Sequence, residues 1–228
     1  MGITFIILNY KFIILNLLYY TKSNDKIKIK GYNENMTVET NIYNEKFFQN
    51  TIKLESDSAL AVVKILLKHF QPKSVIDIGC GCGIYLREFA KHKIEIVGYD
   101  GSPAAIIESL IGDKIKLHDL CEPLKLKQKF DLCLCLEVAE HLPQEYADTL
   151  VETLTGLSDT LIFTAATPGQ GPRSIGHINE QEPEYWIDKF SEKNFVLDKK
   201  LTEKIRTEMK AKNVVWWIVK NLMIFKHT

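Results

Sequence analysis

The stretch VIDIGCGCGIYL at residues 75–86 constrains the fold more than any other part of the chain. A short β-branched run ends in three glycines at alternate positions, and a helical apolar pattern follows Gly83. Glycine tolerates positive φ and lets the backbone approach a ligand closely. A glycine turn between a first strand and a first helix lies at the edge where open α/β sheets bind ligands. The stretch therefore predicts an α/β fold with a ligand site at this turn.

The pattern around this loop alternates between strands and helices. Strands are predicted over residues 74–79, 94–100, 114–119, 130–137, 160–166 and 194–201. Helices are predicted from Ser56 or Ser58 to Pro72, after Gly83, and over residues 102–111, 144–157 and 184–190, followed by a Lys-rich helix. Strands that alternate with helices indicate a parallel sheet with right-handed crossovers, to which the C-terminal segment adds an antiparallel edge.

The first 35 residues differ from the rest. Residues 3–20 are long and apolar enough to raise the question of a membrane span, but Lys11, Asn9 and Asn16 interrupt them at a cost in hydrocarbon. A polar linker then runs to Met36. We predict a dispensable extension at 1–35 and one folded domain at 36–228, with membrane contact possible only through residues 3–20.

The composition indicates which kinds of partner and which cellular compartment are expected. The 29 basic and 29 acidic residues cancel, which disfavours a nucleic-acid partner. Five cysteines lie mostly in apolar segments, which suits buried thiols and a cytoplasmic location. Four of them form two C-x-C pairs, but structural zinc sites use C-x₂₋₄-C spacing, so these pairs are interpreted as packing residues: Cys80, Cys82, Cys133 and Cys135.

The glycine spacing discriminates between nucleotide ligands. The dinucleotide fingerprint G-x-G-x-x-G/A is met at Gly79 and Gly81, but Ile84 stands at its third small position. A Walker A loop is excluded because no Gly-Lys-Ser/Thr follows. An oxidoreductase that uses a nicotinamide is therefore disfavoured.

The string D-x-G-x-G-x-G at residues 77–83 resembles motif I of the class I S-adenosylmethionine-dependent methyltransferases, and the resemblance covers most of residues 56–228. It implies a Rossmann-like, doubly wound α/β fold with a seven-stranded, mostly parallel sheet and an antiparallel C-terminal edge strand. It implies that Asp100 binds the ribose hydroxyls, which suits a carboxylate because it accepts from both. The full set of implied cofactor-binding residues is Asp77, Gly79, Cys80, Gly81, Gly83, Asp100, Gly101, Asp119, Leu120 and Glu137.

The segment LEVAEHLP at residues 136–143 bears on the chemistry. Its E-V-x-E-H string is similar to that of many small-molecule members of the family, among them the ubiquinone-pathway O-methyltransferases, and to that of the small-RNA 3′-end 2′-O-methyltransferases. In those two branches the carboxylates and the histidine help to hold a divalent cation. We expect Glu137, Glu140 and His141 to share one face of a helical turn.

A long loop follows at 164–190, where the G-H-x-N-E-Q…Y-W pattern resembles uncharacterised methyltransferases. It offers His177, Asn179 and Gln181 as polar groups and Tyr185 with Trp186 as an aromatic wall. Candidate catalytic residues are His141, His177 and Glu140, and the open alternative is a metal site made by these three with Glu137. His177 could instead simply fix the loop through a hydrogen bond.

These features together predict methyl transfer from S-adenosylmethionine to an oxygen or nitrogen of a small molecule, lipid or sugar. Two alternatives remain open. One is a metal-assisted RNA 2′-O-methyltransferase, favoured by the carboxylate and histidine pattern. The other is a protein that binds S-adenosylmethionine without turnover.

Overall fold

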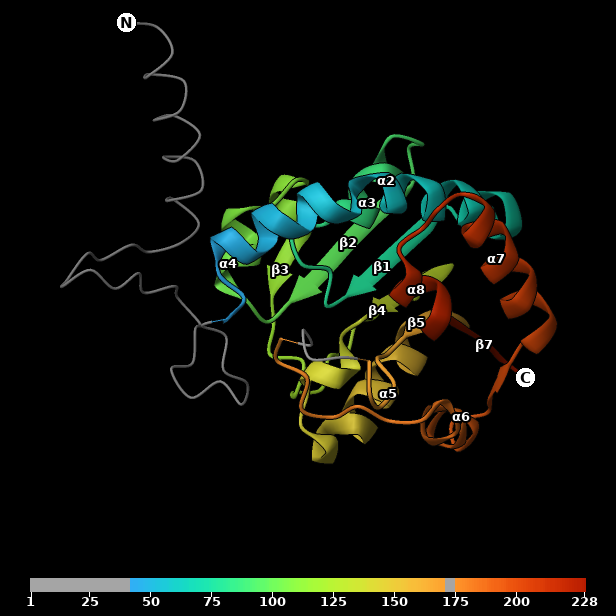
Figure 1. Cartoon of the computed structure of the whole chain (residues 1–228). Coiled ribbons are helices and arrows are strands. Elements are labelled where there is room, and N and C mark those ends of the chain that lie inside the picture. The colour runs from blue at the N-terminus through green and yellow to red at the C-terminus, as the bar shows by residue number, and fades with distance from the viewer. Residues whose placement is uncertain (1–41, 171–174) are drawn as a thin grey trace, which may run out of the picture. The chain divides into compact units, whose positions relative to one another are not determined.

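The computed structural model describes residues 42–170 and 175–228 (Figure 1). The predicted extension at 1–35 and the start of the predicted domain at Met36 lie outside these residues. Within the described part of the chain, no helix has the length and hydropathy that a membrane crossing requires.

A single sheet of seven strands forms the centre of the domain, in the order β3-β2-β1-β4-β5-β7-β6. The first five strands in the chain pair in parallel, and the order reverses direction between β1 and β4. The strands are β1 Ser74–Ile78, β2 Glu95–Asp100, β3 Ile115–Leu117, β4 Leu132–Leu136, β5 Thr160–Thr164, β6 Phe195–Leu197 and β7 Met223–His227. The predicted seven-stranded, mostly parallel, doubly wound sheet is confirmed.

The C-terminal strands complete the sheet, and the predicted antiparallel strand lies one position inside the edge. Strand β7 runs antiparallel to β5 and lies between β5 and β6. The antiparallel strand is therefore the last in the chain, and β6 forms the outer edge beyond it. Its central position in this half of the sheet explains why β7 carries the apolar residues Met223, Ile224 and Phe225, all of them buried.

Helices cover both faces of the sheet (Figure 1). One core packs against α2, α3, α7 and α8, and the other packs against α5 and α6. The helices are α2 Glu45–Phe70, α3 Ile84–Ala90, α4 Pro103–Ile107, α5 Ala147–Leu157, α6 Pro183–Ser191, α7 Lys199–Ala211 and α8 Trp216–Asn221, with short 3₁₀ turns at Gly112–Lys114, Ala139–His141 and Gln144–Tyr146.

The predicted start of the first helix is wrong. Helix α2 begins at Glu45, where the Asn44 side chain caps it by accepting from the Phe47 backbone N–H at 3.1 Å. The two serines expected to cap the helix lie in its interior, and their hydroxyls have other partners. Ser56 donates to the Ile52 carbonyl at 2.6 Å, and the buried Ser58 accepts from the Val215 backbone N–H at 3.1 Å. The helix ends at Phe70, as Pro72 predicts.

Candidate functional site

The glycine loop joins β1 to α3 at the carboxyl edge of the sheet. Gly79, Gly81 and Gly83 have φ values of 77°, 54° and 83°, in the left-handed region that favours glycine. At Gly79 a Cβ atom would also lie 2.3 Å from a methyl carbon of Val138. The backbone N–H groups of Gly79 and Cys80 both donate to the Tyr99 carbonyl, at 2.8 and 3.1 Å. The loop is therefore held against the end of β2 in one conformation.

The cysteine pairs of this region belong to two separate cores. Cys80 and Cys82 pack on the face covered by α2 and α3, whereas Cys133 and Cys135 pack on the opposite face. Burial raises the pKa of the Cys80 thiol well above its ordinary value, and a Cβ on Gly98 would lie 2.5 Å from its sulfur. The two C-x-C pairs cannot share one ion in this arrangement, because the sheet lies between them.

Two carboxylates lie beside the glycine loop. Asp100 ends β2, and its oxygens accept from the backbone N–H groups of Gly81 and Ser102, each at 2.8 Å. Burial raises the pKa of Asp100 to about 6, although these two hydrogen bonds oppose the shift. Asp77 on β1 is 2% exposed, and burial followed by repulsion from Asp100 raises its pKa to about 7. Asp100 and Asp77 therefore make the carboxyl edge of the sheet acidic beside the glycine loop.

The predicted cofactor-binding residues Asp119 and Leu120 follow β3 after a short interval. The strand ends at Leu117, so Asp119 lies in the turn beyond it and its carboxylate accepts from the Cys121 backbone N–H at 3.0 Å. The His118 N–H donates to the Asp100 carbonyl at 2.9 Å, which places this turn next to Gly101 and the ribose candidate. Leu120 is buried beside it.

Glu137 follows β4 in a left-handed conformation with φ 53°. Its backbone N–H donates to the Thr164 hydroxyl at 2.8 Å and to the Thr164 carbonyl at 3.1 Å. The Asn221 amide donates to both of its carboxylate oxygens, at 3.0 and 3.2 Å. The expectation that Glu137 shares a helical face with Glu140 and His141 is wrong, because the helical turn begins only at Ala139.

Glu140, His141 and His177 do come together. One ligand atom from each lies within 4.8 Å of the other two. Glu140 is 0% exposed, and among the described residues neither of its carboxylate oxygens makes a hydrogen bond. Burial, and then repulsion from Glu137, raises the pKa of Glu140 well above its ordinary value. An orphaned carboxylate beside two imidazoles is a donor set that a divalent cation could occupy.

The His141 ring is held through one nitrogen. Its Nδ1 lies 2.8 Å from the Tyr43 hydroxyl and 3.1 Å from the Gly176 carbonyl oxygen. Because that carbonyl can only accept, it favours the tautomer with the proton on Nδ1 and leaves Nε2 as an acceptor. Burial lowers the pKa of His141 to about 4, so the ring is neutral at pH 7. His177 lies edge-on to it at 4.9 Å between ring centroids, with Nδ1 2.8 Å from Glu180.

Tyr43 and Asn221 are site residues that the sequence did not reveal. Tyr43 precedes α2, and its carbonyl accepts from the Ser102 hydroxyl at 2.7 Å. Its own hydroxyl contacts His141, so Tyr43 connects Ser102, which follows β2, with His141. Burial, and then repulsion from Glu140 and Asp100, raises the pKa of Tyr43 to about 12. Both residues are far from the motifs in sequence, and no local pattern marks them.

The loop at 164–190 contributes less than predicted. The backbone N–H groups of Ile178 and Asn179 donate to the Glu140 carbonyl, and Gln181 donates to the Asn179 side chain at 2.8 Å, so these groups fix the loop. The predicted aromatic wall is wrong for Trp186, which is 1% exposed and packs on Phe163 in the core. Helix α6 turns Trp186 and Phe190, four residues apart, toward the sheet.

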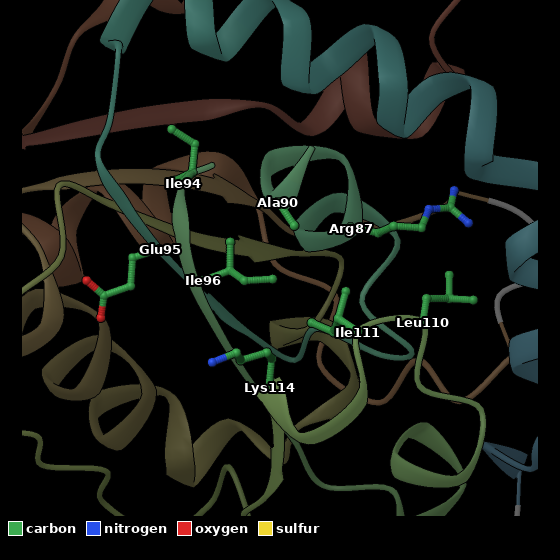
Figure 2. Close-up of a pocket in the computed structure, with 8 residues that line it drawn as sticks. All are labelled: Arg87, Ala90, Ile94, Glu95, Ile96, Leu110, Ile111 and Lys114. Atoms are coloured by element: carbon green, nitrogen blue, oxygen red, sulfur yellow. The ribbon is translucent and has the colours of Figure 1, made fainter. Parts of the chain in front are cut away.

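A hollow of about 430 Å³ lies elsewhere, at the amino end of β2 beside α3. Figure 2 shows its apolar lining of isoleucines, Leu110 and Ala90, with the charged ends of Arg87 and Glu95 directed outward on opposite sides. None of the predicted site residues lines it. The candidate site is therefore the acidic carboxyl edge of the sheet and not this hollow.

Comparison with known proteins defines the class. Residues 53–194 match the family model described as a methyltransferase domain, and the chain belongs to that family. The fold is also that of class I methyltransferases. The structure of the sugar N-methyltransferase KedS8 from Streptoalloteichus superposes with a TM-score of 0.61 over 91% of this chain and 99% of that one, at 12% identity. Magnesium protoporphyrin IX methyltransferase from Synechocystis with bound SAM gives 0.54 over 83% and 89%, at 18% identity.

Particular relatives match over shorter regions. Ubiquinone biosynthesis O-methyltransferase, mitochondrial, of Schizosaccharomyces pombe is 30% identical over 94 residues, 36% of this chain and 34% of that protein. The chloroplastic magnesium protoporphyrin IX methyltransferase of Arabidopsis thaliana is 28% identical over 131 residues, 54% of this chain and 39% of that protein. The chain thus spans between a third and two fifths of the length of these curated relatives.

Proposed function

We propose that this protein is an S-adenosylmethionine-dependent methyltransferase that transfers the methyl group to an oxygen of a small molecule. The family supports methyl transfer. The names of the curated relatives in ubiquinone biosynthesis support an oxygen as the acceptor atom. Structural neighbours with bound SAM or SAH support the donor.

The observation that carries the proposal is a set of carboxyl groups without countercharge. Among the described residues, none of five carboxylates at or next to the glycine loop and the end of β4 has an ion-pair partner: Glu55, Asp77, Asp100, Glu137 and Glu140. Buried negative charge is unfavourable unless a cation compensates it. S-adenosylmethionine carries a sulfonium, an ammonium and one carboxylate, so it is a net cation without phosphate and provides that compensation, whereas phosphate-bearing nucleotides would be repelled.

The reaction requires alignment and removal of one proton. The bond between the sulfonium sulfur and the methyl carbon breaks as the acceptor oxygen attacks in line, and the hydroxyl proton must leave with a base. His141 is neutral, and its Nδ1 is held by Tyr43 and Gly176, which leaves Nε2 to accept that proton. His177, whose Nδ1 is held by Glu180, is the second candidate.

The same three side chains fit a divalent cation. Glu140 offers two oxygens that make no hydrogen bond within the described part of the chain, and His141 and His177 each have Nδ1 engaged in the manner typical of metal-ligating histidines. Two nitrogens and a carboxylate suit zinc or manganese better than magnesium. Such an ion would lower the pKa of a coordinated acceptor hydroxyl. Glu137 is not required, because Asn221 already holds its carboxylate.

The second candidate function is an RNA 2′-O-methyltransferase, and the possible metal site is the observation that supports it. Balanced charge over the whole chain favours the small-molecule acceptor over RNA. A cytoplasmic location remains our proposal, supported by five buried cysteines.

Calorimetry followed by an acceptor search tests the proposal. The full chain is titrated with S-adenosylmethionine and NAD, and then incubated with methyl-labelled donor and candidate phenols, sugars and short RNA. We expect binding of S-adenosylmethionine alone and label in a small molecule. Label in RNA would favour the second candidate, and donor binding without transfer to any acceptor class would favour the non-catalytic alternative.

A further inference from the structure

Three exposed isoleucines lie beside the two histidines of the candidate acceptor site. Ile42 is 36% exposed, Ile175 is 59% exposed and Ile178 is 62% exposed. Eight large apolar side chains among the described residues are at least 36% exposed, and three of the eight belong to this one region. Single exposed apolar residues are common on protein surfaces, whereas a group of them next to a site indicates a binding surface. We call Ile42, Ile175 and Ile178 the isoleucine rim.

Ile42 lies against the backbone next to Ile175. A Cβ atom on Gly176 would lie 2.9 Å from Ile42 Cδ1 and 3.4 Å from His141 Nδ1. The Gly176 carbonyl oxygen also lies 3.1 Å from that nitrogen. Two segments far apart in the sequence therefore bring their isoleucines to the edge of the His141 ring.

Ile178 reaches the same pair of histidines from the far side of His177. It follows His177 directly, and its backbone N–H donates to the carbonyl of Glu140, the residue before His141, at 2.8 Å. The two histidine rings lie 4.9 Å apart between centroids. The rim therefore flanks both imidazoles that the proposed function places at the acceptor.

The polar side chains of the segment that carries Ile175 and Ile178 are already engaged. His177 Nδ1 lies 2.8 Å from a Glu180 oxygen. The Asn179 amide donates to the Ala139 carbonyl at 3.3 Å, and Gln181 donates to Asn179 Oδ1 at 2.8 Å. Apart from the histidines, this segment therefore presents mainly hydrocarbon to a ligand, which suits an apolar acceptor better than a sugar or a ribose.

We propose that the isoleucine rim binds the apolar part of the methyl acceptor, which is a hydroxyl compound with an extended hydrocarbon substituent. The inference rests on the proposed function, because the histidines beside the rim receive the hydroxyl. Burial of the substituent against the rim removes apolar surface from water on both partners. The rim thereby selects the acceptor, while the histidines act on its hydroxyl.

The test measures how affinity depends on the length of an alkyl chain. The full-length protein, saturated with S-adenosylhomocysteine, is titrated by calorimetry with 4-ethylphenol and with 4-hexylphenol, which has four more methylene groups. Each methylene that is fully buried tightens binding by about fourfold. Because the rim remains partly open to solvent, we expect the hexyl compound to bind at least about tenfold more tightly.

Variants then locate the alkyl chain. Ile42→Ser and Ile178→Ser each remove one apolar side chain of the rim, and each should reduce the preference for the hexyl compound by about threefold or more. Val196→Ser is the matched control. Val196 is 50% exposed on the outer strand β6, three positions from β4 in the sheet, so its replacement should leave the preference unchanged.

Three results would overturn the inference. Affinity that does not rise with chain length, or no binding of either phenol, would exclude an apolar acceptor subsite. The same preference in both rim variants as in the wild-type protein would place the alkyl chain elsewhere. A dimer in size-exclusion chromatography that Ile178→Ser dissociates, with phenol affinities unchanged, would assign the rim to contact between copies of the chain.

Binding of S-adenosylhomocysteine, measured first, separates this inference from the proposed function. If S-adenosylhomocysteine binds and the phenol titrations fail, the rim is wrong and the methyltransferase proposal stands. If S-adenosylhomocysteine does not bind, both are wrong.

Discussion

The two halves of the site are built in different ways. On the donor side, the glycine loop and Asp100 contact each other across 19 positions of sequence and belong to consecutive elements. On the acceptor side, Tyr43 reaches His141 across 98 positions and Gly176 reaches the same ring across 35. The first half is a local βαβ unit, and the second half is assembled from segments that lie far apart in the sequence. Changes in the first should therefore affect binding and stability, and changes in the second should affect turnover.

The largest effect is expected at Gly79. Gly79→Ala places a Cβ 2.3 Å from Val138 and requires an L-residue at φ 77°, so it should destabilise the domain by about 3 kcal/mol and abolish donor binding. Thermal unfolding and calorimetry measure both. The matched control is Gly156→Ala in α5, where a Cβ meets nothing within 4 Å and stability should rise slightly. Equal behaviour of the two variants would contradict the loop assignment.

The next effect is expected at the ribose candidate. Asp100→Ala removes a carboxylate that accepts from two backbone N–H groups, so it should weaken donor binding by about 1–3 kcal/mol and loosen the loop. Calorimetry gives the affinity, and hydrogen exchange at the Gly81 amide gives the loop opening. Unchanged affinity would exclude Asp100 from the ribose site.

These two positions show what the sequence could predict. Alternating strands and helices were sufficient for the sheet, and glycine spacing was sufficient for the loop, because both depend on neighbours in sequence. The predicted helix start at Ser56 was wrong, because a serine that donates to the carbonyl of the preceding turn cannot be told from an N-cap by sequence. The prediction that Trp186 lines the site was wrong for a similar reason, because an aromatic residue after a loop can equally pack in the hydrophobic core. Tyr43 and Asn221 could not be found, because only the tertiary fold brings them to the site.

A change confined to the acceptor side should lower turnover and spare the donor. Tyr43→Phe keeps the ring that packs edge-on to Phe47 and His141 but removes the hydroxyl bound to Nδ1. We expect kcat to fall by about tenfold, equivalent to about 1.4 kcal/mol, with donor affinity unchanged. Steady-state kinetics and calorimetry measure the two quantities. Tyr146→Phe, which alters no hydrogen bond among the described residues, is the control, and reduced donor affinity in Tyr43→Phe would contradict the division of the site.

The same carboxylates predict a pH dependence that has opposite signs for stability and binding. The pKa values of Asp77, about 7, and Asp100, about 6, are raised above their ordinary value. The charged forms therefore destabilise the free protein, and its stability should increase as pH falls from about 7 toward 4. Binding of the cationic donor needs the charged forms and should weaken over the same range. Asp77→Asn should flatten both profiles, and parallel profiles for stability and binding would contradict the prediction.

The central claim is that the carboxylates at the sheet edge, which have no ion pair with any residue that the structure describes, select a cationic nucleoside. Calorimetric titration of the full-length protein with S-adenosylmethionine, NAD and ATP at pH 7.5 tests it most directly. The account predicts binding of one S-adenosylmethionine per chain and no heat of binding for the two phosphate-bearing nucleotides. Binding of NAD or ATP with no response to S-adenosylmethionine would contradict it.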